Sequence, residues 1–325
     1  MAAFGSSLFL IGGVEYASKS TQRVFAIAIF NLGSLCIDHV YRVTELAGSG
    51  ETVAAKSYDV FPGGKGLNQS LAAAKAGAEV THAGAIGGDA TWLLDLLSKA
   101  GATVDPVQVL DGASGHALIQ VNDKGENSIV INGGTNRQLS RDYIDTVLDQ
   151  VQSSDWLLLQ NEINELDYVL AQAHTKSLRV AFNIAPPDER IQGYPLDAVR
   201  LFVLNLHEAA ALTGQESEAE VMAALQQRYP NASSVLTLGS AGLHYFAPGS
   251  NGFEFLPAHS VTPVDETAAG DAFTGYLLAG LSQGTSFEDA LKLASAAGAL
   301  AVTAAGAASS IPDRAAVDRF LTAKQ

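Results

Sequence analysis

The sequence predicts an α/β protein in which helices cover both faces of a mostly parallel sheet, accompanied by a small separate β-sheet. Three observations favour this class. Short runs of Val, Ile and Leu alternate with helical patterns along most of the chain. Each run ends in polar or glycine residues, as strands do when they reach the edge of a buried sheet. Two further segments have strand-like composition without helical periodicity.

The buried strands are expected where the apolar runs are continuous. These runs are 24–30, 79–86, 156–160, 179–182, 201–204 and 235–238. Ligands of open α/β sheets bind just beyond the carboxyl ends of the strands. Polar or glycine residues fall at these positions, namely Asn31, Glu162, Asn183, Asn205 and Gly239. One such residue is an ordinary start of a loop, but five together predict a shared cleft.

The small sheet is expected from two segments that interrupt the alternation. The first is 33–61, which includes a strand-like stretch at 52–58. In the second, runs at 117–121 and 128–131 flank a turn containing Gly125, which predicts a β-hairpin. Together they predict a lid over the cleft. The expected organisation is a disordered N-terminal extension at 1–22, an α/β domain of 23–32, 62–112 and 133–325, and a β-lid of 33–61 and 113–132.

Charge and cysteine content exclude several classes of function. The chain has 325 residues, of which 34 are acidic and 19 basic, for a net charge of −15. Such a surface repels nucleic acid and anionic membranes, so neither is an expected partner. With Cys36 as its single cysteine, the chain forms no internal disulfide and no cysteine zinc cluster. No run is long enough to span a bilayer, and no basic residue precedes the mildly apolar stretch 6–14, so a cytoplasmic location is expected.

The segment 264–271, Val-Asp-Glu-Thr-Ala-Ala-Gly-Asp, carries the strongest chemical signal. A helical run follows it, and small residues before a helix let backbone N–H groups and the helix dipole approach an anion. This suits charge that develops on a transferring phosphoryl group. Asp271, in the first turn, is placed to accept a hydroxyl proton. The alternative is an ordinary helix start in which Asp271 only complements the dipole.

A second motif, Gly-Gly-Lys-Gly-Leu-Asn-Gln at 63–69, precedes a helix expected to run through Ala76, with Gly77 at its C-terminal end. Three glycines at a helix start permit close approach to a polar ligand. Asn68 would reach hydroxyl groups from the first turn. The spacing matches neither a Walker A loop nor a dinucleotide fingerprint. The alternative is a simple loop-to-helix turn.

The pair GGKGLNQS (63–70) and VDETAAGDAFTG (264–275) resembles the ribokinase-like family of carbohydrate kinases. The resemblance extends in order over most of the chain from Val24, through GSLCIDH (33–39), GETVAAKSYDVF (50–61), LLLQNE (157–162), FNIAPP (182–187), NLHEAAALTG (205–214), LTLGSAG (236–242) and AVTAAGAASSIP (301–312). It implies a three-layer α/β/α sandwich with a β-sheet lid, ATP-dependent phosphorylation of a sugar, use of Mg²⁺ and K⁺, and a homodimer formed through the lid.

The resemblance also implies roles for individual residues. The sugar would be bound by Asp38, Gly63, Gly64, Lys65, Asn68 and Glu162. Asn205 and Glu208 would organise Mg²⁺ and its waters, and Thr237, Gly239 and Gly242 would border the nucleotide. Ala268, Ala269 and Gly270 would form the anion hole, with Asp271 as the base. Potassium would bind oxygen ligands of Asp265, Thr267, Ala301, Ala304, Gly306 and Ser310.

Three positions depart from the family pattern. Glu266 stands where Thr is usual and is expected to face solvent, and Ala268 stands where Gly is frequent. Cys36 occupies a sugar-facing position where ribokinases carry Asn, and its alternative role is apolar packing. Ribose, phosphorylated at its 5-hydroxyl, is the first expected substrate.

Three other functions stay open at this point. The first is a kinase for another substrate of the superfamily, such as fructose, 2-keto-3-deoxygluconate or adenosine. The second is a sugar or nucleotide sensor that has lost turnover, against which Asp271 argues. The third is a dinucleotide-dependent oxidoreductase, which is disfavoured because no Gly-x-Gly-x-x-Gly follows the first strand.

Overall fold

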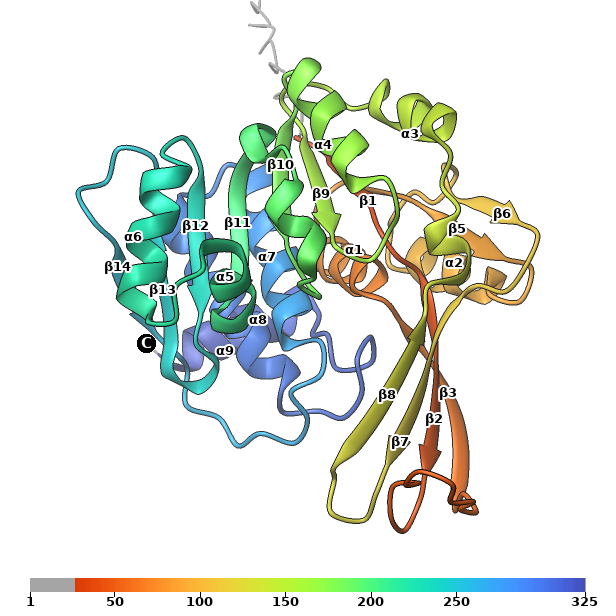
Figure 1. Cartoon of the computed structure of the whole chain (residues 1–325). Helices are drawn as coiled ribbons and strands as arrows, with labels where there is room; N and C mark the ends of the chain where they lie inside the picture. Colours follow the sequence, from red (N-terminus) through yellow and green to blue (C-terminus); the bar gives the residue numbers. More distant parts are fainter. Residues whose placement is uncertain (1–26, 325) are drawn as a thin grey trace, which may run out of the picture.

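The main sheet of the protein has eight strands in the order β14-β13-β12-β11-β10-β9-β1-β4 (Figure 1). The computed structural model describes residues 27–324. Six neighbouring strands are parallel, and β13 and β14 add antiparallel strands at one edge. The strands are β1 Ile29–Leu32, β4 Val80–Ala83, β9 Trp156–Gln160, β10 Arg179–Asn183, β11 Val199–Asn205, β12 Ser233–Thr237, β13 Gly242–Phe246 and β14 Glu254–Pro257.

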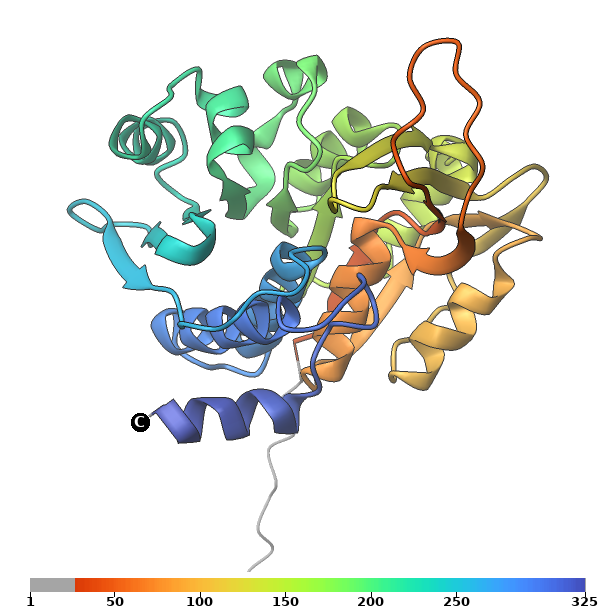
Figure 2. The ribbon, with the colours of Figure 1, turned by 90° about the horizontal axis from the view of Figure 1, so that it is seen from below.

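Helices cover both faces of this sheet, which lies between them in Figure 2. Side chains alternate along each strand, so Leu158 enters one apolar core while Leu157 and Leu159 enter the other. The first core is closed by α1 Lys65–Lys75, α2 Thr91–Lys99, α7 Ala269–Ser282, α8 Phe287–Ala301 and α9 Arg314–Lys324. The second is closed by α3 Arg141–Leu148, α4 Leu166–Thr175, α5 Leu206–Thr213 and α6 Glu218–Arg228. The predicted fold class, a three-layer α/β/α sandwich, is confirmed.

A second sheet of four strands, in the order β3-β2-β7-β8, projects from the main body (Figure 1). Its strands are β2 Cys36–Arg42, β3 Ser57–Gly63, β7 Gly115–Val121 and β8 Asn127–Asn132. A two-stranded sheet pairs β5 Ala85–Gly87 with β6 Gln108–Leu110. Short 3₁₀ helices complete the chain: η1 Gly134–Arg137, η2 Glu189–Gly193, η3 Leu196–Ala198 and η4 Gly239–Ala241.

Most of the predicted elements are present, with differences at their ends. The hairpin expected around Gly125 is formed by β7 and β8, which pair antiparallel from Val121 and Asn127. The run 79–86 is not one strand, because it breaks at Gly84 into β4 and β5, which belong to different sheets. The stretch 52–58 was predicted as a strand, but only its last two residues are in β3. The partner strand β2 ends at Arg42, opposite Ser57, so residues 52–56 have no strand of this sheet beside them.

The predicted first run, 24–30, overlaps β1 only at its end, and its residues up to 26 lie outside the described part of the chain, as does the predicted extension at 1–22. Among residues 27–324, no helix is both long enough and apolar enough to cross a membrane.

Candidate active site

Helices α1 and α7 bring the two sequence motifs together. Gly275 of α7 makes this possible, because a Cβ at that position would lie 2.5 Å from the Cβ of Ala72 in α1. Across this contact, Asn68 Nδ2 donates to Asp271 Oδ2 at 3.0 Å and Gln69 Nε2 donates to Asp271 Oδ1 at 2.9 Å. The carboxylate is 6% exposed, so it is held between two amides at the inner end of a cleft.

The start of α7 has the features of an anion-binding site. Its first helical hydrogen bond runs from the Ala272 amide to the Ala268 carbonyl at 2.8 Å. The amides of Gly270 and Asp271 lie before this bond and therefore have no carbonyl partner within the helix. A Cβ at Gly270 would meet no heavy atom within 4 Å, which leaves its backbone approachable. Ala268 has φ 60°, a left-handed conformation that is uncommon for alanine. The Ala269 amide points elsewhere, toward the Glu266 carbonyl at 3.3 Å.

A cavity of about 210 Å³ opens in front of these amides. Its lining comes from the ends of β10, β11 and β12 and from the starts of α1, α5 and α7. The lining residues are Lys65, Asn183, Val203, Leu204, Asn205, Glu208, Thr237, Glu266, Ala268, Gly270, Asp271 and Thr274. Of the five residues expected at the strand ends, Asn183 and Asn205 thus share one cleft with the predicted base.

Two glycines expected to border the nucleotide do not line this cavity. Gly242 has φ 129°, and a Cβ there would lie 2.2 Å from the Leu256 carbonyl, so its identity is explained by packing against β14. Gly239 has φ 58° in the turn after β12, with open space where a Cβ would be. Of the predicted nucleotide-binding residues on this loop, Thr237 is the one that reaches the cavity.

Asn205 and Glu208 form a capping box at the start of α5. The Asn205 Oδ1 accepts from the Glu208 amide at 2.9 Å, and the Glu208 Oε2 accepts from the Asn205 amide at 3.1 Å. The Asn205 Nδ2 also donates to Glu208 Oε1 at 2.8 Å. Burial raises the pKa of Glu208, so its charge is poorly solvated and favours a nearby cation. Among the described residues, no group of three or more His, Cys, Asp or Glu side chains has a metal-binding arrangement.

Lys65 places a positive charge in this acidic cleft. Burial lowers the pKa of its ammonium, but negative charges outweigh burial and raise the pKa above its usual value. Those charges belong to Asp271, Glu162 and Glu208. Glu162 in turn accepts a hydrogen bond from the Lys65 amide at 2.9 Å and another from the Ser34 hydroxyl. Lys65 therefore lies between the group predicted to bind sugar and the group predicted to bind nucleotide.

Asp38 approaches this group from the second sheet. It faces Gly63 so closely that a Cβ there would lie 2.3 Å from its Oδ2, which accounts for the first glycine of the motif. Burial, and then the negative charge of Glu162, raise the pKa of Asp38 to about 6. Gly64, with φ 93°, is the N-cap of α1. Two acceptor carboxylates thus converge where a ligand rich in hydroxyl groups would satisfy both.

Asn68 has an acceptor to offer such a ligand. Its Nδ2 is bound to Asp271, whereas its Oδ1 is buried without a hydrogen-bond partner. Buried acceptors are rarely left unpaired in native proteins, so this atom marks a place for a donor.

The loop expected to hold a monovalent cation is closed by Asp265. Its Oδ1 accepts from the Thr267 amide at 2.9 Å and the Thr267 hydroxyl at 2.6 Å, and its Oδ2 accepts from the Gly306 amide at 2.9 Å. Partial burial raises the pKa of Asp265, but these hydrogen bonds hold it below its usual value. The Ala301 carbonyl accepts from the Ala304 amide at 3.2 Å, and the Ser310 hydroxyl donates to the Ala307 carbonyl at 2.9 Å. Hydrogen bonds thus connect Asp265 directly to Thr267 and to Gly306. Ala301, Ala304 and Ser310 instead form hydrogen bonds with residues near them in the sequence.

Two sequence expectations need correction. Asn31 was expected in the cleft, but β1 continues past it and α1 covers it, so it is fully buried and donates to Gly66 and Ser70. Gly239, as described, does not line the cavity. Glu266 is exposed, as expected, and it also lines the cavity.

Sequence reasoning missed Gln69, which contacts Asp271 directly. It belongs to the quoted motif, where it stands between two other polar residues, Asn68 and Ser70, at the start of a helix that is apolar from Leu71 to Ala74. Cys36 is buried, and its sulfur accepts from Asn136 at 3.4 Å, which favours the packing role.

Comparison with known proteins shows the family of the chain. The model of the pfkB family carbohydrate kinases matches residues 27–314. The chain is 33% identical to ribokinase of Bacillus subtilis over 298 residues, which cover 90% of this chain and 98% of the relative. It superimposes on ribokinase from Thermotoga maritima with a TM-score of 0.81 at 32% identity, covering 91% of this chain and 99% of that one. A structure of Arabidopsis thaliana ribokinase complexed with ribose and ATP has a TM-score of 0.79 at 28% identity, covering 91% and 99%. The chain therefore belongs to the pfkB family of carbohydrate kinases.

Proposed function

We propose that this protein is an ATP-dependent kinase that transfers the γ-phosphate of ATP to the 5-hydroxyl of ribose. One observation carries the proposal. A buried carboxylate, Asp271, lies at the start of a helix whose Gly270 amide is approachable, and it borders both the Asn68 acceptor and the 210 Å³ cavity. A base and an anion-stabilising site are thus adjacent, as in-line phosphoryl transfer requires. The ribokinase relatives support ribose as the substrate.

In the proposed reaction, Asp271 accepts the proton of the sugar hydroxyl. The hydroxyl oxygen forms a bond to the γ-phosphorus as the bond to the bridging oxygen breaks, and that electron pair leaves with ADP. The amides that begin α7 stabilise charge on the transferring group. The ammonium of Lys65 lies in the same cavity and adds a positive charge in a site otherwise lined by carboxylates.

The sugar would bind between the second sheet and α1. Asp38 and Glu162 offer carboxylate acceptors, Asn68 Oδ1 offers a buried acceptor, and Gly63 with Gly64 lets the backbone approach. Several acceptors around one site suit a polyol, which is rich in hydroxyl donors. In this proposal the second sheet is a lid, and the α/β domain supplies the nucleotide site.

Two cations complete the proposal. Asn205 and Glu208 would hold Mg²⁺ through its waters, because an amide and a single buried carboxylate suit an ion that keeps most of its hydration. When bound, Mg²⁺ neutralises phosphate charge. The oxygen atoms of Asp265, Thr267 and Gly306, with those of Ala301, Ala304 and Ser310, would hold K⁺ beside the anion-binding loop. The fit rests on the oxygen donor set and on the low pKa of Asp265, which keeps it charged.

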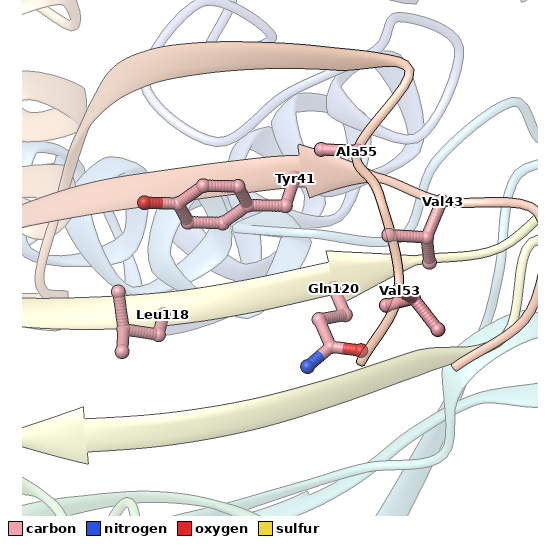
Figure 3. A pocket seen from close by; sticks show the side chains of 6 residues that line it. All are labelled: Tyr41, Val43, Val53, Ala55, Leu118 and Gln120. Atoms are coloured by element: carbon pink, nitrogen blue, oxygen red, sulfur yellow. The ribbon is translucent and has the colours of Figure 1, made fainter. Parts of the chain in front are cut away.

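The lid also offers a surface for a second copy of the chain. Strand alternation places Tyr41, Tyr58, Val60, Leu118 and Val130 on the sheet face opposite Asp38, which we call the outer lid face. Tyr58 is 50% exposed, Leu118 45% and Val130 64%. A cavity of about 240 Å³ opens there between β2, β7 and the segment 53–55 (Figure 3). We propose that this face forms a homodimer, since exposed apolar side chains favour burial against a partner and the opposite face carries Asp38 of the proposed sugar site.

Release of ADP from ATP with a panel of acceptors tests the proposed activity. The panel is ribose, fructose, 2-keto-3-deoxygluconate and adenosine, each with Mg²⁺ and K⁺. Ribose is expected to give the highest kcat/KM, with ribose 5-phosphate as product. A higher kcat/KM with another acceptor would replace ribose in the proposal, and no release with any acceptor would favour the sensor. The proposed setting is the cytoplasm, where the single thiol of Cys36 stays reduced.

A further inference from the structure

A chain of buried amides lies behind Asp271. Gln69 is fully buried on α1, and its Nε2 donates both to Asp271 Oδ1 at 2.9 Å and to Asn183 Oδ1 at 3.0 Å. Its Oε1 accepts from Gln160 Nε2 at 2.8 Å. Gln160 and Gln69 are each at most 1% exposed, so water does not compete for these bonds.

The amide of Gln69 has one orientation that fits these partners. Both of its N–H groups face acceptors, and its carbonyl faces a donor. Rotating the amide by 180° would point its oxygen at the Asp271 carboxylate and at the Asn183 carbonyl. All three groups are hydrogen-bond acceptors, so no hydrogen bond could form between them. The rotated orientation of the Gln69 amide is therefore strongly disfavoured, because its oxygen would face the negative charge of Asp271.

The neighbouring amides are fixed in the same way. Asn183 Nδ2 donates to the Val203 carbonyl at 2.9 Å and to Glu208 at 3.3 Å, which turns its oxygen toward Gln69. On the other side, Gln160 Nε2 also donates to Asn31 Oδ1 at 3.1 Å, and Asn31 Nδ2 donates to Ser70 Oγ at 2.8 Å. Gln160 Oε1 is buried without a hydrogen-bond partner, but the Nε2 groups of Gln69 and Gln160 each donate to two acceptors, and these donors set the orientation of both amides.

From this geometry we propose that Gln69 is a positioning residue for Asp271, holding its Oδ1 so that Oδ2, beside Asn68, faces the hydroxyl that it deprotonates. This inference rests on the proposed role of Asp271 as the base. A hydrogen bond to a charged group is stronger than a neutral one, and small displacements of a catalytic group reduce turnover sharply. Gln69 acts through Asp271, so its loss affects kcat more than binding of ribose or ATP.

Gln69→Met is the direct test, because it keeps the length of the side chain and removes both donors. It is expected to lower kcat with ribose by about 10- to 100-fold. The KM values for ribose and ATP are expected to stay within about threefold of wild type, because no proposed substrate contact is removed. The matched control is Tyr143→Phe, which removes a buried hydroxyl bonded to Gly84 and Pro106 and outside this network. Tyr143→Phe is expected to lose stability and keep kcat.

The outcomes separate positioning from a structural role. If Gln69→Met lowers kcat no more than Tyr143→Phe does, or if KM rises while kcat is unchanged, the proposal is wrong. Should Gln69→Met fail to fold, Gln160→Met applies, because it leaves both donors of Gln69 but removes the group that orients them. It is expected to lower kcat by about 3- to 10-fold, and an unchanged kcat overturns the proposal.

The same measurements on Asp271→Asn distinguish this inference from the proposed function. An inactive Asp271→Asn with a fully active Gln69→Met refutes positioning alone. A fully active Asp271→Asn refutes the base, and positioning with it.

Discussion

The Asn68 amide donates a 3.0 Å hydrogen bond to Asp271, joining the starts of α1 and α7 across 203 residues of sequence. This bond leaves the other end of the Asn68 amide buried and unpaired. The predicted base and an acceptor for the substrate thus occupy one small region.

Asp38→Asn should stabilise the protein at neutral pH and weaken sugar binding. The folded-state pKa of Asp38 is raised from 3.8 to about 6, so wild type loses stability as pH rises through this window. Asn does not titrate. The variant should therefore gain about 3 kcal/mol above pH ~6 and nothing below pH ~4, because each pKa unit corresponds to about 1.4 kcal/mol.

Urea unfolding at a series of pH values measures this gain, and initial rates measure KM. The KM for ribose should rise more than the KM for ATP. A gain in stability that is the same at all pH values, or a KM change confined to ATP, would contradict the placement of Asp38.

Ala268→Gly should stabilise the fold, because Ala268 has φ 60° and glycine adopts that conformation without strain. Relief of about 1–2 kcal/mol of strain is partly offset by the flexibility of glycine in the unfolded chain, leaving a gain of about 0.5–1 kcal/mol. Chemical denaturation measures it. Ala223→Gly, at an exposed position within α6, is the matched control and should lose about 1 kcal/mol. Equal losses in both variants would show that Ala268 is not strained.

Potassium should accelerate the wild-type enzyme, and Asp265→Ala should abolish the response. Asp265 joins Thr267 to Gly306, so a cation held there would order the loop before α7. The rate in KCl should exceed that in choline chloride of equal ionic strength by at least about fivefold, a common size for coupling between sites. An unchanged rate would show that the loop does not use K⁺.

Leu118→Arg should convert the proposed dimer to a monomer. Leu118 is 45% exposed in the centre of the outer lid face, where a buried unpaired charge would be costly. The dissociation constant should rise by about 100-fold or more by sedimentation equilibrium. Val109→Arg, at a 56% exposed position on β6, is the control and should leave assembly unchanged. A wild-type protein that is monomeric at micromolar concentration would refute the dimer.

The sequence was sufficient to predict the layers of the fold and the meeting of its two motifs. Apolar runs located strands because burial on both faces leaves little choice of residue. It was insufficient to predict where one strand ends and the next begins, and which side chains of a helix face the active site. Gly84 ends one strand and starts another, and the rotation of α1 turns Gln69 toward Asp271 while burying Asn31. Such contacts depend on how α1 packs against α7, which local patterns do not specify.

The positive φ of Ala268 is another feature that the sequence concealed. Alanine rarely adopts this conformation, so its residue type argued against it. The lining of the cavity by Glu266 was missed for a similar reason, since an exposed acidic residue ordinarily faces solvent away from a site for anions.

The turnover of Asp271→Asn with ribose and ATP tests the central claim most directly. Asn has nearly the same shape and cannot accept the hydroxyl proton, so kcat should fall by about 10²- to 10⁴-fold. Calorimetry should find ATP binding within about threefold of wild type, which excludes misfolding as the cause. Near-normal turnover in this variant would contradict the account, because the carboxylate at the start of α7 would then not be the base.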